Sequence, residues 1–193
     1  MKVLIDNGHG CDTPGKRSPD GRIREWEYCR RVADAVSKAL EREGIDTVRI
    51  VKEDTDVSLA ERVRRVNALA RREPCVLVSV HLNAAGGDGR WHEARGFLPF
   101  VSPNASPKSK SLARMMYDEA ERRNLKGNRW MGRDRYKVRN LAMCRETACP
   151  AVLTENLFQD NTADVDYLLT EEGFINIVAL HVAALKRYVE SYG

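Results

Sequence analysis

The chain has 193 residues, of which 42% are hydrophobic and 31% are charged. These values suit one compact domain with a sizeable core, and we expect residues 1–193 to form a single domain and a monomer. The net charge of +4 is too small to indicate nucleic acid as a partner. The apolar run at the start is too short for a signal-peptide core or a membrane span, so we expect synthesis in the cytoplasm and no membrane insertion.

The first predicted element is a short apolar strand that runs into a histidine between two glycines, Gly8-His9-Gly10. Glycines permit a sharp bend and add no side-chain bulk, so we expect the imidazole of His9 to be accessible at the strand end. An ordinary strand-to-loop turn explains this motif equally well when it is considered alone. The function of His9 therefore depends on partners elsewhere in the chain.

A helix is predicted from Glu25 to Glu43, where Gly44 stops it. Its apolar residues recur at steps of three and four and form one face. Glu25 falls on this apolar face, whereas Glu27 and Arg30 fall on the polar face. An inward carboxylate in the first turn of a helix either caps backbone N–H groups or serves as a ligand.

Strands and helices continue to alternate along the chain. Strands are predicted at 45–51, 75–83, 96–101 and 150–155, and helices at 58–72, 107–124 and 172–192. The run from 75 to 83 is almost wholly apolar, which is typical of a strand buried on both faces, and it carries His81 near its end. The last strand ends in Glu155. This alternation predicts a mostly parallel sheet with helices on both faces.

Two other histidines have simpler interpretations. His92 lies beside Trp91 in a glycine-rich loop. It is either an exposed loop residue or a residue that contacts the substrate. His181 is surrounded by apolar residues at helical spacing, so we expect it in the core.

The segment 122–139 is rich in basic residues that are interleaved with Trp130 and Tyr136. It is either a solvated basic loop or a surface for an anionic ligand, such as a carboxylate-bearing peptide or a nucleic acid.

The five cysteines form an odd set without a CxxC pair, which argues against a disulfide framework. Cys149 with His81 would be a thiol protease pair, but no third group that could orient the base is recognisable. We therefore expect thiols that serve in packing.

Several titratable side chains are expected to meet at one edge of the sheet. Ligands of parallel sheets bind at the carboxyl ends of the strands, where His9, His81 and Glu155 lie, and the helix that begins at Glu25 rises from the same edge. Two imidazoles and one carboxylate make a three-ligand zinc set that leaves a position for water, as in hydrolytic zinc sites. Glu25 is the better ligand because it follows the His9 loop directly, and Glu155 would be the general base. Physical reasoning alone allows the two glutamates to exchange these roles.

Short motifs occur in order along nearly the whole chain: 5–10, Glu25, Ser58-Leu59 with Arg62 and Asn67, 79–83, and 150–155 followed by Phe158 and Asn161. In this order and spacing they resemble the zinc-dependent N-acetylmuramoyl-L-alanine amidases of the Amidase_3 family. The resemblance implies an α/β/α sandwich with a twisted, mostly parallel sheet of about six strands. It also implies that His9, Glu25 and His81 bind Zn²⁺ and that Glu155 is the catalytic glutamate.

The segment 11–24 is similar to that of phage and prophage members of the family, so we expect an endolysin-like enzyme that reaches the cell wall after release or by another route of export. The implied reaction hydrolyses the amide between N-acetylmuramic acid and L-alanine in peptidoglycan. Candidate substrate-binding residues are Asn83, Trp130, Arg133 and Lys137. A zinc carboxypeptidase or aminopeptidase and a non-catalytic cell-wall-binding module are the alternatives.

Overall fold

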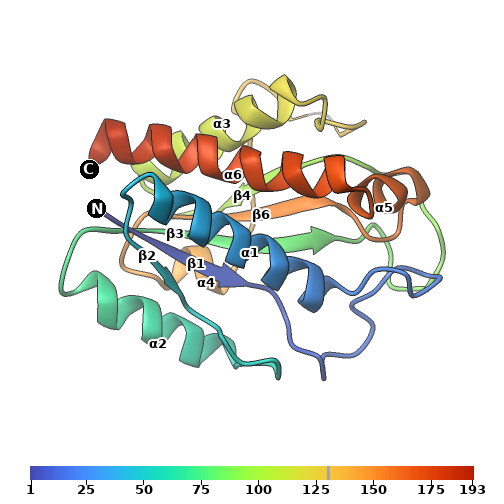
Figure 1. The fold of residues 1–193 in the computed structure, drawn as a ribbon, viewed down its shortest axis with the longest axis horizontal. Coiled ribbons are helices and arrows are strands. Elements are labelled where there is room, and N and C mark those ends of the chain that lie inside the picture. Colours follow the sequence, from blue (N-terminus) through green and yellow to red (C-terminus); the bar gives the residue numbers. More distant parts are fainter. Residues whose placement is uncertain (130) are drawn as a thin grey trace.

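The computed structural model of the chain describes residues 1–129 and 131–193. Its strands form one sheet in the order β2-β1-β3-β6-β4-β5 (Figure 1). The strands are β1 (Lys2–Asn7), β2 (Thr47–Arg49), β3 (Cys75–Asn83), β4 (Leu98–Val101), β5 (Lys137–Val138) and β6 (Ala151–Phe158). All neighbouring pairs are parallel except β4 and β6, which are antiparallel. The expected mostly parallel sheet of about six strands is confirmed.

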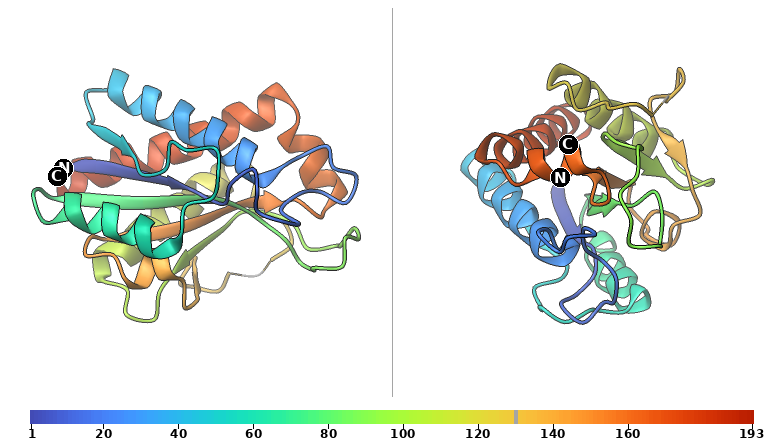
Figure 2. Two further views of the ribbon diagram at one scale, coloured as in Figure 1. Left: turned by 90° about the horizontal axis from the view of Figure 1, so that it is seen from below. Right: turned by 90° about the vertical axis from the view of Figure 1, so that its right-hand side faces the viewer.

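Helices cover both faces of this sheet, so the expected three-layer sandwich is also confirmed (Figures 1 and 2). One face carries α1 (Glu25–Arg42), α3 (Pro107–Arg122), α5 (Thr162–Leu168) and α6 (Glu171–Tyr192), and the other carries α2 (Leu59–Ala70) and α4 (Ala142–Arg145). Successive side chains of a strand point to opposite faces. Val3 and Ile5 of β1 accordingly lie in the core under α1 and α6, whereas Leu4 lies in the core under α2.

The elements with clear patterns in the sequence form where the sequence predicts them. β3 spans the apolar run from 75 to 83, and its first six residues are buried. The helix predicted from residue 58 begins there, because the side chain of Ser58 accepts a hydrogen bond from the backbone N–H of Glu61 and so caps α2. β2 is shorter than predicted, and β6 continues to Phe158, beyond the predicted end at Glu155. The unpredicted elements β5, α4 and α5 have two, four and seven residues, too few for a clear period.

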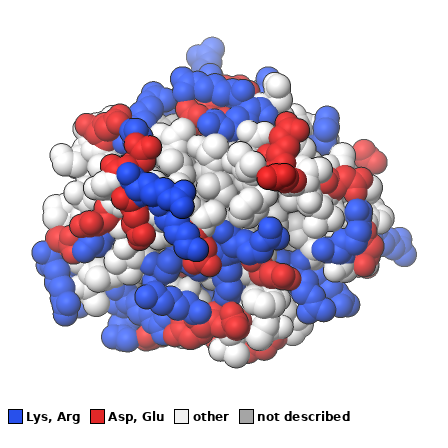
Figure 3. All heavy atoms as spheres, viewed as in Figure 1, with Lys and Arg blue, Asp and Glu red and all other residues white. Residues whose placement is uncertain are grey.

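The two chain termini lie at one end of the molecule, and β1 and β3 run from there towards the other end (Figures 1 and 2). Basic and acidic side chains are interspersed over the face that α1 and α6 cover, so this face shows no extended area of one charge (Figure 3). Among the described residues, no single helix is long and apolar enough to cross a membrane. Helices α5 and α6 would match a span by length and composition only as a pair that is bent by 85°.

Candidate active site

The loop after β1 brings the backbone unusually close to its neighbours. A Cβ atom on Gly8 would collide with the imidazole of His81, and one on Gly10 would collide with the backbone at Asp56. The positive φ of 60° belongs to His9 itself. The two glycines are therefore required because the backbone closely approaches its neighbours, and it is the histidine that adopts the left-handed conformation.

Two arginines hold the carbonyl of His9 in this conformation. Nη1 of Arg30 donates to it at 3.0 Å and Nη2 of Arg62 at 3.4 Å. Arg30 also donates to the carbonyl of Glu53, so it bridges two loops. The prediction that Arg30 lies on the polar face of α1 is wrong: its side chain is buried because it satisfies these backbone carbonyls.

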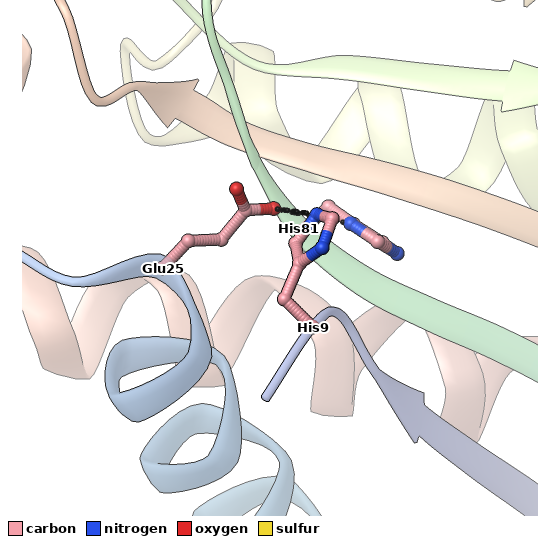
Figure 4. Close-up of side chains that lie close together, drawn as sticks. All are labelled: His9, Glu25 and His81. Carbon is pink, nitrogen blue, oxygen red and sulfur yellow. Dashed lines mark hydrogen bonds and ion pairs between the residues drawn. The ribbon is translucent and has the colours of Figure 1, made fainter. Parts of the chain in front are cut away.

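Side chains from three separate segments meet beside this loop: His9, Glu25 and His81 (Figure 4). Oε1 of Glu25 lies 3.1 Å from Nδ1 of His81 and 3.4 Å from Nε2 of His9. One donor atom from each residue lies within 4.8 Å of the others. Donors at 2.0–2.2 Å from a tetrahedral zinc ion stand about 3.4 Å apart, so the two distances from Oε1 of Glu25 match the spacing that such an ion needs.

Glu25 is 1% exposed and its carboxylate is held from several sides. The backbone N–H of Leu82 donates to Oε1 at 3.1 Å, and the side-chain amide of Gln159 donates to Oε2 at 3.2 Å. Burial raises the pKa of this carboxyl group, but hydrogen bonds with His81 and His9 outweigh burial and keep its pKa well below the usual range. Glu25 is therefore ionised, as a metal ligand must be.

Glu155 lies on the neighbouring strand, in register with His81. Residues in register on parallel strands point to the same face, so the Glu155 side chain lies beside the cluster without belonging to it. Its Oε2 atom is buried and has no hydrogen-bond partner among the described residues. Burial, together with the negative charge of Glu25, raises the pKa of Glu155 to about 7. The pKa values of Glu25 and Glu155 are thus shifted in opposite directions, which is typical of a metal ligand and an acid–base group in one site.

Comparison with known proteins identifies the family of this chain. The sequence profile of Amidase_3, described as N-acetylmuramoyl-L-alanine amidase, matches residues 3–187. The chain belongs to the Amidase_3 family. Its members are hydrolases, and this chain is therefore an enzyme of that class.

Several known proteins are similar to nearly all of this chain. The N-acetylmuramoyl-L-alanine amidase CwlM of Bacillus licheniformis is 30% identical over 97% of this chain and 68% of its own length. The endolysin of Bacillus phage SPP1 is 32% identical over 92% of this chain and 61% of its own length. The crystal structure of an N-acetylmuramoyl-L-alanine amidase from Clostridium difficile 630 has a TM-score of 0.85 at 26% identity, covering 100% of this chain and 98% of that one.

A cavity of about 420 Å³ lies on the same sheet face of this Amidase_3 chain as Glu155. Asn83 and Lys137, two of the predicted substrate-binding residues, line it. Arg133 is exposed and is not among the lining residues, so the structure does not bring it to this cavity. Trp130, the remaining predicted contact, lies outside the described residues.

The other polar candidates lie away from the cluster. His181 is buried between Thr154 and the carbonyl of Ile177, as expected for a core residue. Nε2 of His92 lies 2.9 Å from the carboxylate of Asp88 in its loop.

The thiol alternative is contradicted by the position and acidity of Cys149. The register of β3 with β6 begins at Leu77 and Ala151, so Cys149 precedes the amino end of β6 whereas His81 lies near the carboxyl end of β3. Burial raises the pKa of Cys149 to about 12, which keeps the thiol protonated.

Gln159 is a site residue that the sequence patterns did not reveal. Its side-chain amide donates to the carboxylate of Glu25 and so helps to orient this candidate ligand. Its backbone N–H donates to the carbonyl of Asn83 at 2.8 Å, which keeps the end of β6 beside the end of β3. The available signal was the apolar pair Leu157-Phe158, which indicates that the strand continues past Glu155.

Proposed function

We propose that this chain is a zinc-dependent N-acetylmuramoyl-L-alanine amidase in which residues 1–193 form one catalytic domain. His9, Glu25 and His81 would hold the metal ion. The observation that carries this proposal is the buried carboxylate of Glu25, which lies 3.1 Å and 3.4 Å from two imidazole nitrogens. The proposal also rests on the family to which the chain belongs.

When bound, Zn²⁺ would supply Lewis-acid chemistry that polarises the scissile carbonyl and makes water more acidic. Glu155 takes a proton from the attacking water and later donates it to the nitrogen of L-alanine as the C–N bond breaks. The oxygen of water ends in the lactyl carboxylate of N-acetylmuramic acid, and the stem peptide leaves with a free amine. Burial raises the pKa of Glu155 towards neutrality, which suits a group that both accepts and returns a proton.

The substrate of the proposed reaction is peptidoglycan. Asn83 and Lys137 are the proposed contacts within the cavity beside Glu155, and Arg133 and Trp130 remain predictions from the sequence alone. We place the enzyme's action at the cell wall, after release or export, since one relative is a phage endolysin.

The proposal is tested by two measurements on the purified chain and on His81→Ala. Metal content by mass spectrometry should be close to one zinc per wild-type chain and much lower in the variant. Wild-type protein should release free amino termini and intact stem peptides from purified peptidoglycan, and the variant should not.

The alternatives differ in their products. Release of single amino acids would indicate an exopeptidase. Binding to peptidoglycan without any release, by protein that contains zinc, would indicate a wall-binding module and would overturn the proposal.

A further inference from the structure

The basic segment 122–139 divides into two parts with different surroundings. Arg122 and Arg123 both pair with Glu119. Arg135 pairs with Asp118 and Glu121. The positive charges of these three arginines are neutralised by carboxylates of α3.

A second group of basic residues lines the cavity beside the candidate active site: Arg129, Lys137 and Arg139. No Asp or Glu is among the described residues that line this cavity. In the part of the chain that the structure describes, Arg129 and Arg139 form no ion pair with a carboxylate, in contrast to Arg122, Arg123 and Arg135. The positive charges of Arg129 and Arg139 are thus available to a ligand.

The register of the strands relates this cavity to Glu155. Leu98 pairs with Glu155 and Phe100 pairs with Leu153, and both β4 residues line the cavity. Paired residues point to the same face of a sheet, so the cavity opens on the face that carries the Glu155 carboxyl group. The guanidinium of Arg139 lies 5.5 Å from the centre of the Phe100 ring.

The sheet geometry also sets the distance between Glu155 and Phe100, the cavity residue beside Arg139. A strand spacing of about 4.8 Å and a rise of about 3.3 Å per residue place Phe100 roughly 8 Å from Glu155. An extended peptide spans about 3.5 Å per residue, so two residues reach about 7 Å. A peptide whose first amide is cleaved beside Glu155 therefore brings its second residue near the guanidinium of Arg139.

We propose that Arg139, with Arg129 and Lys137, recognises a free carboxylate on the second residue of the stem peptide. This inference rests on the proposed amidase function and names the chemical group that the site selects. A guanidinium donates paired hydrogen bonds to a carboxylate. A carboxamide at the same place has no negative charge, and its NH2 group is itself a hydrogen-bond donor that cannot accept from the guanidinium. The enzyme consequently prefers stem peptides in which this carboxylate is not amidated.

The test uses two N-acetylmuramoyl tripeptides that differ only in the second residue, which carries a free α-carboxylate in one and a carboxamide in the other. Wild-type enzyme should cleave the carboxylate form with a kcat/KM about tenfold higher, mainly through a lower KM. In Arg139→Gln this preference should fall to near one, mainly through a higher KM for the carboxylate form. Arg139→Lys should keep part of the preference because it retains the charge.

Arg187→Gln is the matched control, since it removes the same charge from an exposed position on α6, on the opposite face of the sheet. It should leave the preference at its wild-type value. The affinity of wild type and Arg139→Gln for the two free tripeptides, measured by calorimetry, provides a second readout that requires no cleavage.

The outcomes separate the two proposals. If wild type cleaves both muramoyl tripeptides equally, or if Arg139→Gln keeps the preference, the carboxylate inference is overturned while the amidase function stands. If wild type cleaves neither, the amidase proposal fails. In that case, equal affinity for the two free tripeptides would overturn the carboxylate inference as well.

Discussion

The guanidinium of Arg62 lies 2.8 Å from the carboxylate of Asp6, and both side chains are almost fully buried. The same guanidinium donates to the carbonyl groups of Asn7 and His9. A residue of α2 thereby fixes the loop that carries a candidate metal ligand.

Replacement of Arg62 by Met should therefore affect both stability and metal binding. Removing one partner of a buried ion pair costs roughly 3 to 5 kcal/mol of unfolding free energy because the other charge is left unpaired. Zinc affinity should also fall by roughly 10- to 100-fold, since the His9 loop loses a support. Chemical denaturation and zinc titration measure the two effects. The double variant Asp6→Leu with Arg62→Met should be less destabilised than Arg62→Met alone, and equal loss would contradict this account.

Glu155→Gln should remove activity without removing the metal. The amide cannot accept a proton from water, so kcat should fall by roughly 10² to 10⁴. Zinc content should remain at the wild-type level, because Glu155 lies outside the cluster of His9, Glu25 and His81. Glu25→Gln is the contrasting variant, which should lose zinc together with activity. Retention of activity by Glu155→Gln would exclude it as the base.

The activity should fall on the acidic side of neutrality. Burial raises the pKa of Glu155 from 4.5 to about 7, and a dication held beside it would lower that value. A general base must be ionised, so kcat/KM should decrease as the pH falls through a midpoint between 4.5 and 7. Zinc content is measured at each pH, which separates this titration from loss of the metal. A pH-independent kcat/KM over this range would contradict the assignment.

Gln159→Ala should weaken zinc binding while leaving the fold intact. Its side-chain amide donates to Oε2 of Glu25 at 3.2 Å and so helps to orient the carboxylate. Loss of such an outer contact typically lowers metal affinity by roughly 10- to 100-fold. At saturating zinc, kcat should return to near the wild-type value. An unchanged dissociation constant for zinc would show that Gln159 does not position Glu25.

His181 should make the stability of the protein depend on pH in the acid range. Burial lowers the pKa of His181 to about 4, below its usual value of 6.5. Between these values the unfolded chain binds the proton and the folded chain does not. The contribution of neutral His181 to the free energy of unfolding is therefore complete above pH 6.5 and is lost as the pH falls to about 4. The shift corresponds to about 3 kcal/mol of unfolding free energy.

The check is a comparison of wild type with His181→Gln by denaturation at several pH values. The variant should be less stable near neutral pH, and the difference from wild type should shrink as the pH falls from 6.5 to about 4. A constant difference over this range would contradict the expected titration.

Much of the fold follows from local patterns in the sequence. The apolar run of β3 and the apolar face of α1 place His81 and Glu25 inside the molecule, because side-chain direction repeats every two residues in a strand and every 3.6 in a helix. The alternation of strands and helices also predicts the mostly parallel sheet, in which β1, β3 and β6 lie side by side.

The assignment of the two glutamates depended on contacts between distant segments. By sequence Glu25 and Glu155 could exchange roles, but in the structure Glu25 contacts His9 and His81 whereas Glu155 has a buried oxygen without a partner among the described residues. These surroundings shift the two pKa values in opposite directions. No local pattern contains that information, because it arises from burial and from charges on other strands.

The same distinction applies to the basic residues. The sequence determined that positive charge is concentrated between 122 and 139. Only the tertiary structure decided that Arg122 and Arg135 pair with carboxylates of α3, whereas Arg139 lines the cavity beside Glu155. The physical reason is that periodicity determines which face of its own element a residue occupies, while the packing of distant elements determines which charges lie within reach of it.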